Sequence, residues 1–109
     1  MDQAQTPQEF FNTVLPAKFK PEKAAGVDVI AQIHIAGPDG GDWVVTIRNQ
    51  KLGVKEGTDA ASNLTLKMNY ADFMDMVNDR LSAEKAFFTG KVQFKGNIAL
   101  ALKLKDAGF

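Results

Sequence analysis

Hydrophobic and polar residues alternate over several stretches of the chain. The alternation is longest in residues 27–35, and shorter stretches follow it. These shorter stretches are residues 43–47, 52–54, 64–68 and 92–95. A period of two is typical of strands that bury one face. The pattern therefore predicts a five-stranded sheet, and the short connections between the first four strands favour mostly antiparallel pairing.

The first helix is predicted near the start of the sequence. Thr6 can cap this helix, Pro7 suits its first position, and Glu9 completes a capping box. The apolar residues within 10–15 then recur at helical spacing. We therefore expect a helix with one apolar face before the first strand.

Two helices are predicted between the fourth and fifth strands. Asn69 can cap a helix over residues 70–79, and Ser82 can cap a short helix that ends at Thr89-Gly90. The expected inner side chains of the longer helix are Phe73, Met76, Val77 and Leu81, with Met74 widening the stripe. The short helix carries Ala86, Phe87 and Phe88.

The last segment, residues 98–105, has features of both a strand and a helix. Its apolar residues alternate, but alanine, leucine and lysine dominate and only Ile98 is β-branched. We interpret the segment as a helix. Such a helix is apolar nearly all round as far as Lys103, so it should be buried on more than one side or cover a cavity.

Length and element order together predict one domain over residues 1–109. A chain of 109 residues fits a single domain. The predicted order is helix, four strands, two helices, strand and helix. Helices that flank a mostly antiparallel sheet make the fold class α+β, or mixed α/β.

Composition narrows the classes of partner. Thirteen Lys and Arg balance thirteen Asp and Glu, which argues against a nucleic-acid partner and against a strongly basic membrane-docking surface. A local basic patch is compatible with this balance. The sequence has no cysteine, which removes disulfides and thiolate metal sites and is consistent with a cytoplasmic protein.

Candidate catalytic and metal-binding groups are few. We interpret His34, the single histidine, as a polar strand residue because no nucleophile or second ligand lies at a recognisable spacing. Asp72, Asp75 and Asp79 share one helix face, which favours a solvated surface over a cation site. The glycines of residues 37–41 favour a hairpin over a phosphate loop. We therefore expect no catalytic residues, no metal and no cofactor.

Large apolar side chains are concentrated in the second half of the sequence. Six of them fall within 21 positions: Met68, Phe73, Met74, Met76, Phe87 and Phe88. Methionine adapts to varied apolar ligands, so this group fits the lining of a lipid pocket. Filling of an ordinary core explains the same residues, and the pattern alone favours that explanation.

Three motifs resemble the sterol carrier protein 2-like family. They are Leu64-Thr65-Leu66-Lys67-Met68 followed by Tyr70-Ala71-Asp72-Phe73, the segment Ala86-Phe87-Phe88-Thr89-Gly90-Lys91 that leads through residues 92–95 to Gly96-Asn97, and the hairpin Gly40-Gly41-Asp42-Trp43. The resemblance spans about residues 10–104. One departure is Asn78-Asp79-Arg80-Leu81, which stands where the family has a Gly-Lys-Leu step. The end of the preceding helix is therefore left open.

The resemblance implies a five-stranded sheet covered by helices, with an apolar tunnel between the sheet and the helices. Family members bind sterols, fatty acids, acyl-CoA or phospholipid-like molecules and have no catalytic residues of their own. The implied lining is Phe73, Met74, Met76, Val77, Phe87, Phe88, Ala101, Leu102 and Leu104. The expected partner is thus a lipid-like small molecule, with transient membrane contact and no nucleic acid. The animal members' peroxisomal signal is absent from residues 106–109, which points to a cytoplasmic form.

Three functions stay open at this point. The first is a carrier domain for an apolar ligand, which the resemblance favours. The second is an accessory or scaffold domain that presents a lipid-like substrate within an enzyme assembly, and exposed apolar surface at Phe87-Phe88 or on the last helix would mark it. The third is a small enzyme, which the missing pairing of nucleophile and base disfavours. The sequence specifies neither the ligand nor the oligomeric state.

Overall fold

A five-stranded sheet is the frame of the structure, a computed structural model that describes residues 3–108. The sequence prediction about a peroxisomal signal concerned residues 106–109, and of these Phe109 lies outside the described range. The strands are β1 Val29–Ala36, β2 Gly41–Arg48, β3 Lys51–Glu56, β4 Leu64–Asn69 and β5 Val92–Gly96, in the spatial order β3-β2-β1-β4-β5. β1 and β4 pair in parallel and the other pairs are antiparallel. The predicted five-stranded, mostly antiparallel sheet is therefore confirmed.

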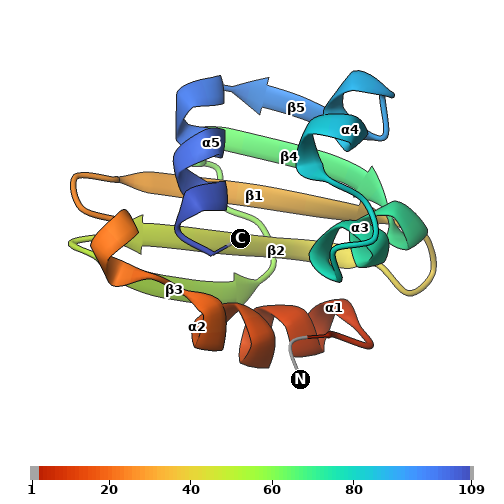
Figure 1. The fold of residues 1–109 in the computed structure, drawn as a ribbon, viewed down its shortest axis with the longest axis horizontal. Coiled ribbons are helices and arrows are strands. Elements are labelled where there is room, and N and C mark those ends of the chain that lie inside the picture. Colours follow the sequence, from red (N-terminus) through yellow and green to blue (C-terminus); the bar gives the residue numbers. More distant parts are fainter. Residues whose placement is uncertain (1–2, 109) are drawn as a thin grey trace.

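The helices lie before β1, between β4 and β5, and after β5. They are α1 Pro7–Glu9, the π-helical η1 Phe10–Val14, α2 Leu15–Lys18, the 3-10 helix η2 Pro21–Lys23, α3 Tyr70–Val77, α4 Ala83–Phe88 and α5 Ile98–Asp106. In Figure 1, α5 crosses in front of the strands on the left, and α3 and α4 lie near the right-hand ends of the strands. The helices α1 and α2 run along the sheet edge at β3. The α+β class is confirmed. Within residues 3–108, every helix is too short or too polar to cross a bilayer.

The two faces of the sheet follow the alternation in the sequence. Every second residue of β1 from Val29 to Ile35 is almost fully buried. The intervening side chains, among them Gln32 and His34, lie on the opposite face because successive strand residues point to opposite sides. One face of the sheet therefore forms the core with the helices, and the other is mainly polar.

Local capping and turn signals determine where most elements begin. The side chains of Thr6, Asn69 and Ser82 each accept a hydrogen bond from the backbone N–H three residues later, at 3.1, 2.7 and 3.1 Å. These bonds satisfy donors that the start of a helix leaves free. Asn49 and Gln50, with φ angles of 51° and 61°, form the tight turn between β2 and β3. The predicted helix caps are confirmed.

The structure determines the end of the central helix, which the sequence left open, and corrects its buried stripe. α3 ends at Val77, two residues early, because Asp79 takes a φ angle of 63° that cannot continue a right-handed helix. The buried side of α3 consists of Phe73, Met74 and Val77, whereas Met76 is only half-buried. Met74 therefore takes the place in the buried stripe that was expected for Met76.

The last segment forms the helix α5, as its propensities predicted. Of the two arrangements expected for it, burial on more than one side is not found, and the covering of a cavity stays a prediction. Leu104 is buried beneath α5, whereas Ile98 and Leu102 are exposed. The helix lies on the outside of the molecule, and no other element within residues 3–108 covers those two side chains. A sequence pattern cannot show how many layers a short chain provides, and here a single helical layer covers the sheet.

Gln32 holds the loop between β3 and β4 against the uncovered face of the sheet. Its side chain is 9% exposed, and its Nε2 donates hydrogen bonds to the carbonyls of Trp43 and Gly57 at 3.1 and 3.0 Å. Its Oε1 accepts a hydrogen bond from the backbone N–H of Asp59 at 2.9 Å. One amide thus satisfies three backbone groups that come from β2 and from the loop.

Replacing Gln32 by leucine should lower the free energy of unfolding by about 1–3 kcal/mol, because the three backbone groups lose their partner. Gln93→Leu is the matched control, since Gln93 lies on the same face of the sheet but is exposed. Its effect should stay within about 0.5 kcal/mol. Urea unfolding followed by tryptophan fluorescence measures both variants, and equal losses would contradict the bonding role of Gln32.

Candidate ligand-binding groove

Four aromatic rings pack together beneath the N-terminal helices. Phe11 stacks on Trp43 and on Phe73, with ring centroids 4.8 and 5.7 Å apart. Phe10 meets Phe11 and Phe73 edge-on at 5.2 and 5.8 Å. All four side chains are at most 3% exposed. This aromatic cluster joins η1, β2 and α3 and fills the space between them.

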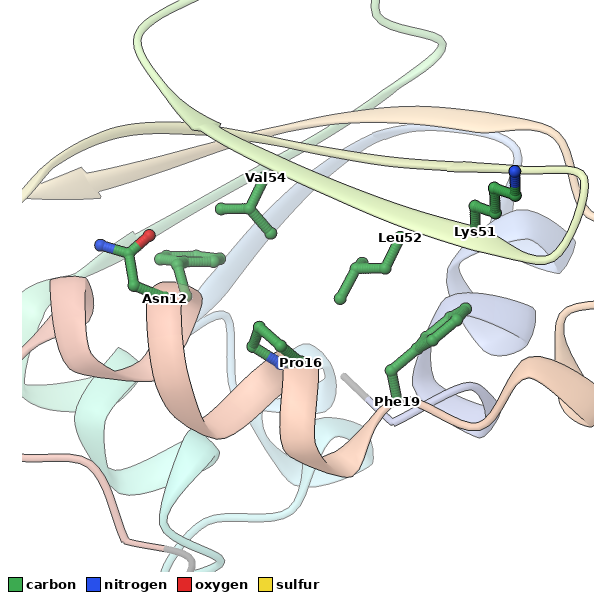
Figure 2. Close-up of a pocket in the computed structure, with 7 residues that line it drawn as sticks. Asn12, Pro16, Phe19, Lys51, Leu52 and Val54 are labelled. Atoms are coloured by element: carbon green, nitrogen blue, oxygen red, sulfur yellow. The ribbon is translucent and has the colours of Figure 1, made fainter.

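An open groove lies beside the aromatic cluster, between the N-terminal helices and the edge strand β3. Its volume is about 550 Å³, and it is lined by Phe11, Asn12, Pro16, Phe19, Lys51, Leu52 and Val54. Figure 2 shows Leu52 and Val54 extending from the strand toward the helical segment that carries Pro16 and Phe19. Phe11 thus belongs to both the aromatic cluster and the groove.

The register of β3 explains why its apolar side chains face the groove. Leu52 and Val54 pair with Ile47 and Val45 of β2, so they lie on the helix-covered face of the sheet. β3 is an edge strand and has no neighbour beyond it. Both side chains are therefore only half-buried and remain available for contact.

The groove offers apolar contact and little polar chemistry. Five of its seven lining residues are apolar. Asn12 and Lys51 lie at its two ends, and the Lys51 ammonium points away from the apolar side chains (Figure 2). The volume falls within the roughly 300–1,000 Å³ of small-molecule sites. Residues 3–108 contain no cluster of histidine and carboxylate side chains that could hold a metal ion.

The nine predicted lining residues lie elsewhere. Phe73, Met74, Val77 and Leu104 are buried in the core, and Met76 and Ala101 are half-buried against it. Phe87, Phe88 and Leu102 are exposed. None of the nine borders the groove or a second, more polar hollow formed by residues 26–28 and 48–50. The structure brings six of them together in or against the core and leaves three in solvent, so the tunnel lining stays a prediction.

Sequence reasoning missed the groove residues. Phe11 was expected only to belong to an apolar helix face, and residues 52–54 only to form a short strand. One usable signal was present, because a short apolar strand that follows a tight turn is typical of a sheet edge, where side chains stay partly uncovered. The pairing of this strand with the helical segment near Phe19 is a tertiary contact that no spacing in the sequence indicates.

A second apolar region lies on the outside of α4 and α5. Phe87, Phe88, Ile98 and Leu102 are 47%, 83%, 54% and 55% exposed, and we call these four residues the α4–α5 surface. Lys105 of α5 forms an ion pair with Glu84 of α4. The hydrogen bond from the Lys105 ammonium holds the pKa of the Glu84 carboxyl below its usual value.

The polar candidates belong to the surface of the fold. His34 Nδ1 contacts Asp42 Oδ1 between the paired strands β1 and β2, and both side chains are partly exposed. Asp72 and Asp75 each lie near a basic side chain, at 3.8 and 2.9 Å, and Asp79 lies beyond the end of α3. His34 is thus a polar strand residue, as interpreted, and Asp75 is solvated. The expectation that three aspartates share one helix face was wrong, because Asp79 lies beyond the end of α3.

Comparison with known proteins gives a family match over most of the chain. The model of the SCP-2 sterol transfer family matches residues 11–107. Hydroxysteroid dehydrogenase-like protein 2 of Rattus norvegicus is 35% identical over 86 residues, which are 77% of this chain and 16% of that protein. Sterol carrier protein 2 of Homo sapiens is 35% identical over 72 residues, 64% of this chain and 13% of that protein. The chain thus spans about a sixth, or less, of the length of these relatives.

Solved structures share the fold. The sec-alkylsulfatase Pisa1 from Pseudomonas sp. aligns with a TM-score of 0.82 and 22% identity, over 96% of this chain and 16% of the sulfatase. The sterol carrier protein domain 2 of Helicoverpa armigera aligns with a TM-score of 0.69 and 24% identity, over 95% of this chain and 90% of that one. The palmitated SCP2L2 of Aedes aegypti aligns with a TM-score of 0.65 and 23% identity, over 84% and 88%. These likenesses show the architecture of the sheet and its helices.

Phe73→Ala should lower the free energy of unfolding by about 3–5 kcal/mol, because the lost ring leaves a cavity in the aromatic cluster. Phe88→Ala should change it by no more than about 0.5 kcal/mol, because Phe88 is exposed. Urea unfolding measures both variants. A small effect of Phe73→Ala would contradict the packing described here and indicate that Phe73 lines an open tunnel.

Proposed function

This chain belongs to the SCP-2 sterol transfer family, and we propose that it binds a lipid-like, apolar molecule and is itself not an enzyme. The observation that carries the proposal is the open apolar groove between the N-terminal helices and β3. The groove is large enough for a small molecule, and its interior is lined by aromatic and aliphatic side chains (Figure 2).

The driving force would be removal of ligand surface from water. Each Å² of apolar surface that leaves water contributes roughly 25 cal/mol. Phe19 on one side and Leu52 and Val54 on the other offer such surface without first breaking a hydrogen bond. Because the one charged lining residue, Lys51, points away from the groove, the ligand would be selected by shape and apolar area (Figure 2).

Loose specificity follows from this kind of site. A single methylene changes binding in an apolar site by only about 1–3 kcal/mol. Sterols, fatty acids, acyl-CoA and phospholipid-like molecules therefore all stay in the proposed ligand class. The carrier would exchange its cargo at membranes, so transient membrane contact belongs to the proposal. A cytoplasmic location stays a prediction.

The predicted tunnel is a second location for the same ligand. In the structure, the residues predicted to line the tunnel on α3 and α5 pack against the sheet, and Phe73 and Leu104 are almost fully buried. A ligand between the sheet and these helices would have to displace them. The groove needs no such displacement, which makes it the favoured site.

An accessory role within an enzyme assembly is the second candidate function. The α4–α5 surface carries exposed apolar side chains of the kind expected for such a domain. The larger relatives, in which this chain matches about a sixth of the length, fit the same role. In this case the domain would present a lipid-like substrate to a catalytic domain.

Leu52→Trp should weaken binding of a fluorescent long-chain fatty acid by about tenfold, or 1.4 kcal/mol, because the indole occupies the groove. Leu102→Trp is the matched control. It makes the same exchange on the α4–α5 surface, at a position that belongs to the predicted tunnel lining, and should leave the affinity unchanged. Titrations monitored by the visible emission of the probe measure both dissociation constants.

Three outcomes of these titrations would be informative. No saturable binding by the folded wild-type protein, together with no lipid detected by mass spectrometry of small molecules released on purification, would contradict the carrier function. A loss confined to Leu102→Trp would move the ligand to the predicted tunnel. Stable co-purification of a protein partner without ligand binding would favour the accessory role.

A further inference from the structure

The free edge of β3 borders the groove. β3 is the last strand on its side of the sheet and pairs only with β2. Leu52 and Val54 extend from it toward the helical segment that carries Pro16 and Phe19 (Figure 2). An edge strand leaves a row of backbone N–H and C=O groups unpaired. The groove therefore combines apolar side chains with backbone groups that another strand could bond.

The register of the β2–β3 hairpin identifies the unpaired backbone groups. Hydrogen-bonded and non-bonded residue pairs alternate along two antiparallel strands. The N–H of Gly57 donates to the carbonyl of Asp42 at 2.8 Å, so the odd-numbered residues of β3 are the ones that bond to β2. The N–H and C=O groups of Leu52 and Val54 then point away from β2. Within residues 3–108, no loop or helix bonds to them.

The two faces of β3 differ in chemistry. Leu52 and Val54 share the helix-covered face, whereas Lys51 and Lys55 lie on the opposite face and are exposed. In the described part of the chain Lys51 forms no ion pair, and the ammonium of Lys55 lies 3.8 Å from a carboxylate oxygen of Asp59. A strand added at this edge would meet apolar side chains on one face and ammonium groups on the other.

We propose that β3 binds an extended segment of a protein partner as a sixth strand, and that apolar and acidic residues alternate along this segment. The backbone of the segment pairs with the free N–H and C=O groups of Leu52 and Val54. Its apolar side chains enter the groove near Phe19, and its carboxylates lie beside Lys51 and Lys55. In strand addition, backbone hydrogen bonds give affinity and alternate side chains give specificity.

The charges favour a partner peptide over a second copy of this chain. Antiparallel pairing of two β3 strands about Gly53 would place Lys51 directly opposite Lys55, and like charges in that position are destabilising. The helices α1 and α2 also run along the β3 edge (Figure 1), so a second domain would bring its own helices against them. A single extended chain needs only the spacing of about 4.8 Å between neighbouring strands.

The inference goes beyond lipid binding and does not rest on it. A lipid in the groove contacts the side chains of Leu52 and Val54, whereas a peptide strand also needs the backbone groups of these residues. Peptide binding can be measured without any lipid, and fatty-acid binding without any peptide. Failure of one proposal is therefore distinguishable from failure of the other.

The test is fluorescence anisotropy of a labelled peptide, slightly longer than β3, in which valine alternates with glutamate. The full chain should bind this peptide saturably. A peptide with lysine in place of glutamate should bind at least tenfold more weakly, because its ammonium groups then face Lys51 and Lys55. A peptide with the same valines and glutamates in two separate blocks should bind as weakly, because only alternation matches the two faces of β3.

Val54→Pro separates strand pairing from simple apolar contact. The N–H of Val54 points to the free edge, so proline removes an edge donor without breaking a bond between β2 and β3. Val54→Ala is the matched control, because it shortens the same groove side chain but keeps the N–H. Peptide binding should fall at least tenfold further in Val54→Pro than in Val54→Ala. Circular dichroism and urea unfolding check that both variants remain folded.

Hydrogen exchange of the wild-type protein tests the same bonds without any substitution. Exchange followed by nuclear magnetic resonance reports on each backbone amide. The amides of Leu52 and Val54 should exchange at least tenfold more slowly with saturating peptide than without it, because hydrogen bonding protects an amide. The amides of β5, the other edge strand, should keep their rates.

Three results would overturn the proposal. One is the absence of saturable binding of the alternating peptide by the folded protein. Another is equal loss of peptide binding in Val54→Pro and Val54→Ala, which would indicate apolar contact without strand pairing. The third is protection of the Leu52 and Val54 amides that rises with protein concentration in the absence of peptide, which would assign the edge to a second copy of the chain.

Discussion

The packing of the N-terminal helices against the sheet and against α3 depends on the side chain of Phe11. Its ring stacks on both Trp43 and Phe73, so it ties the N-terminal helices to β2 and to α3 at once. The same side chain borders the groove. Because the aromatic cluster fills the space beneath α3, the apolar hollow that remains lies toward the edge strand β3. The core and the candidate site thus share one residue.

The strand order places β3 and β5, the two edges of the sheet, far apart, with three strands between them. β3 ends one side of the strand order and β5 ends the other. The groove forms at the first edge, where Leu52 and Val54 have no covering neighbour. α4 lies near the second edge, and α5 starts there and crosses in front of the other strands (Figure 1). Two apolar regions with different surroundings, a groove and the exposed outer sides of two helices, therefore lie on one sheet.

Polar groups that the structure buries are engaged in holding the fold together. Gln32 bonds three backbone groups, and Asn78 bonds both the N–H and the carbonyl of Ala4, at 2.7 and 2.9 Å. Within residues 3–108, every buried side-chain nitrogen and oxygen has a hydrogen-bond partner. The groove is lined instead mainly by apolar side chains.

The sequence by itself determined the local structure, because alternation, caps and turn residues act within a few positions. Asn69 and Ser82 begin their helices as predicted, and the strands lie where the period of two indicated. Only the tertiary structure decided which apolar residues are covered. Phe87 and Phe88 remain exposed because no layer lies over α4. Likewise, residues near 11–19 and 51–54 form a groove because the β2–β3 hairpin brings an edge strand alongside the first helices, and a contact between segments so distant leaves no periodic signal.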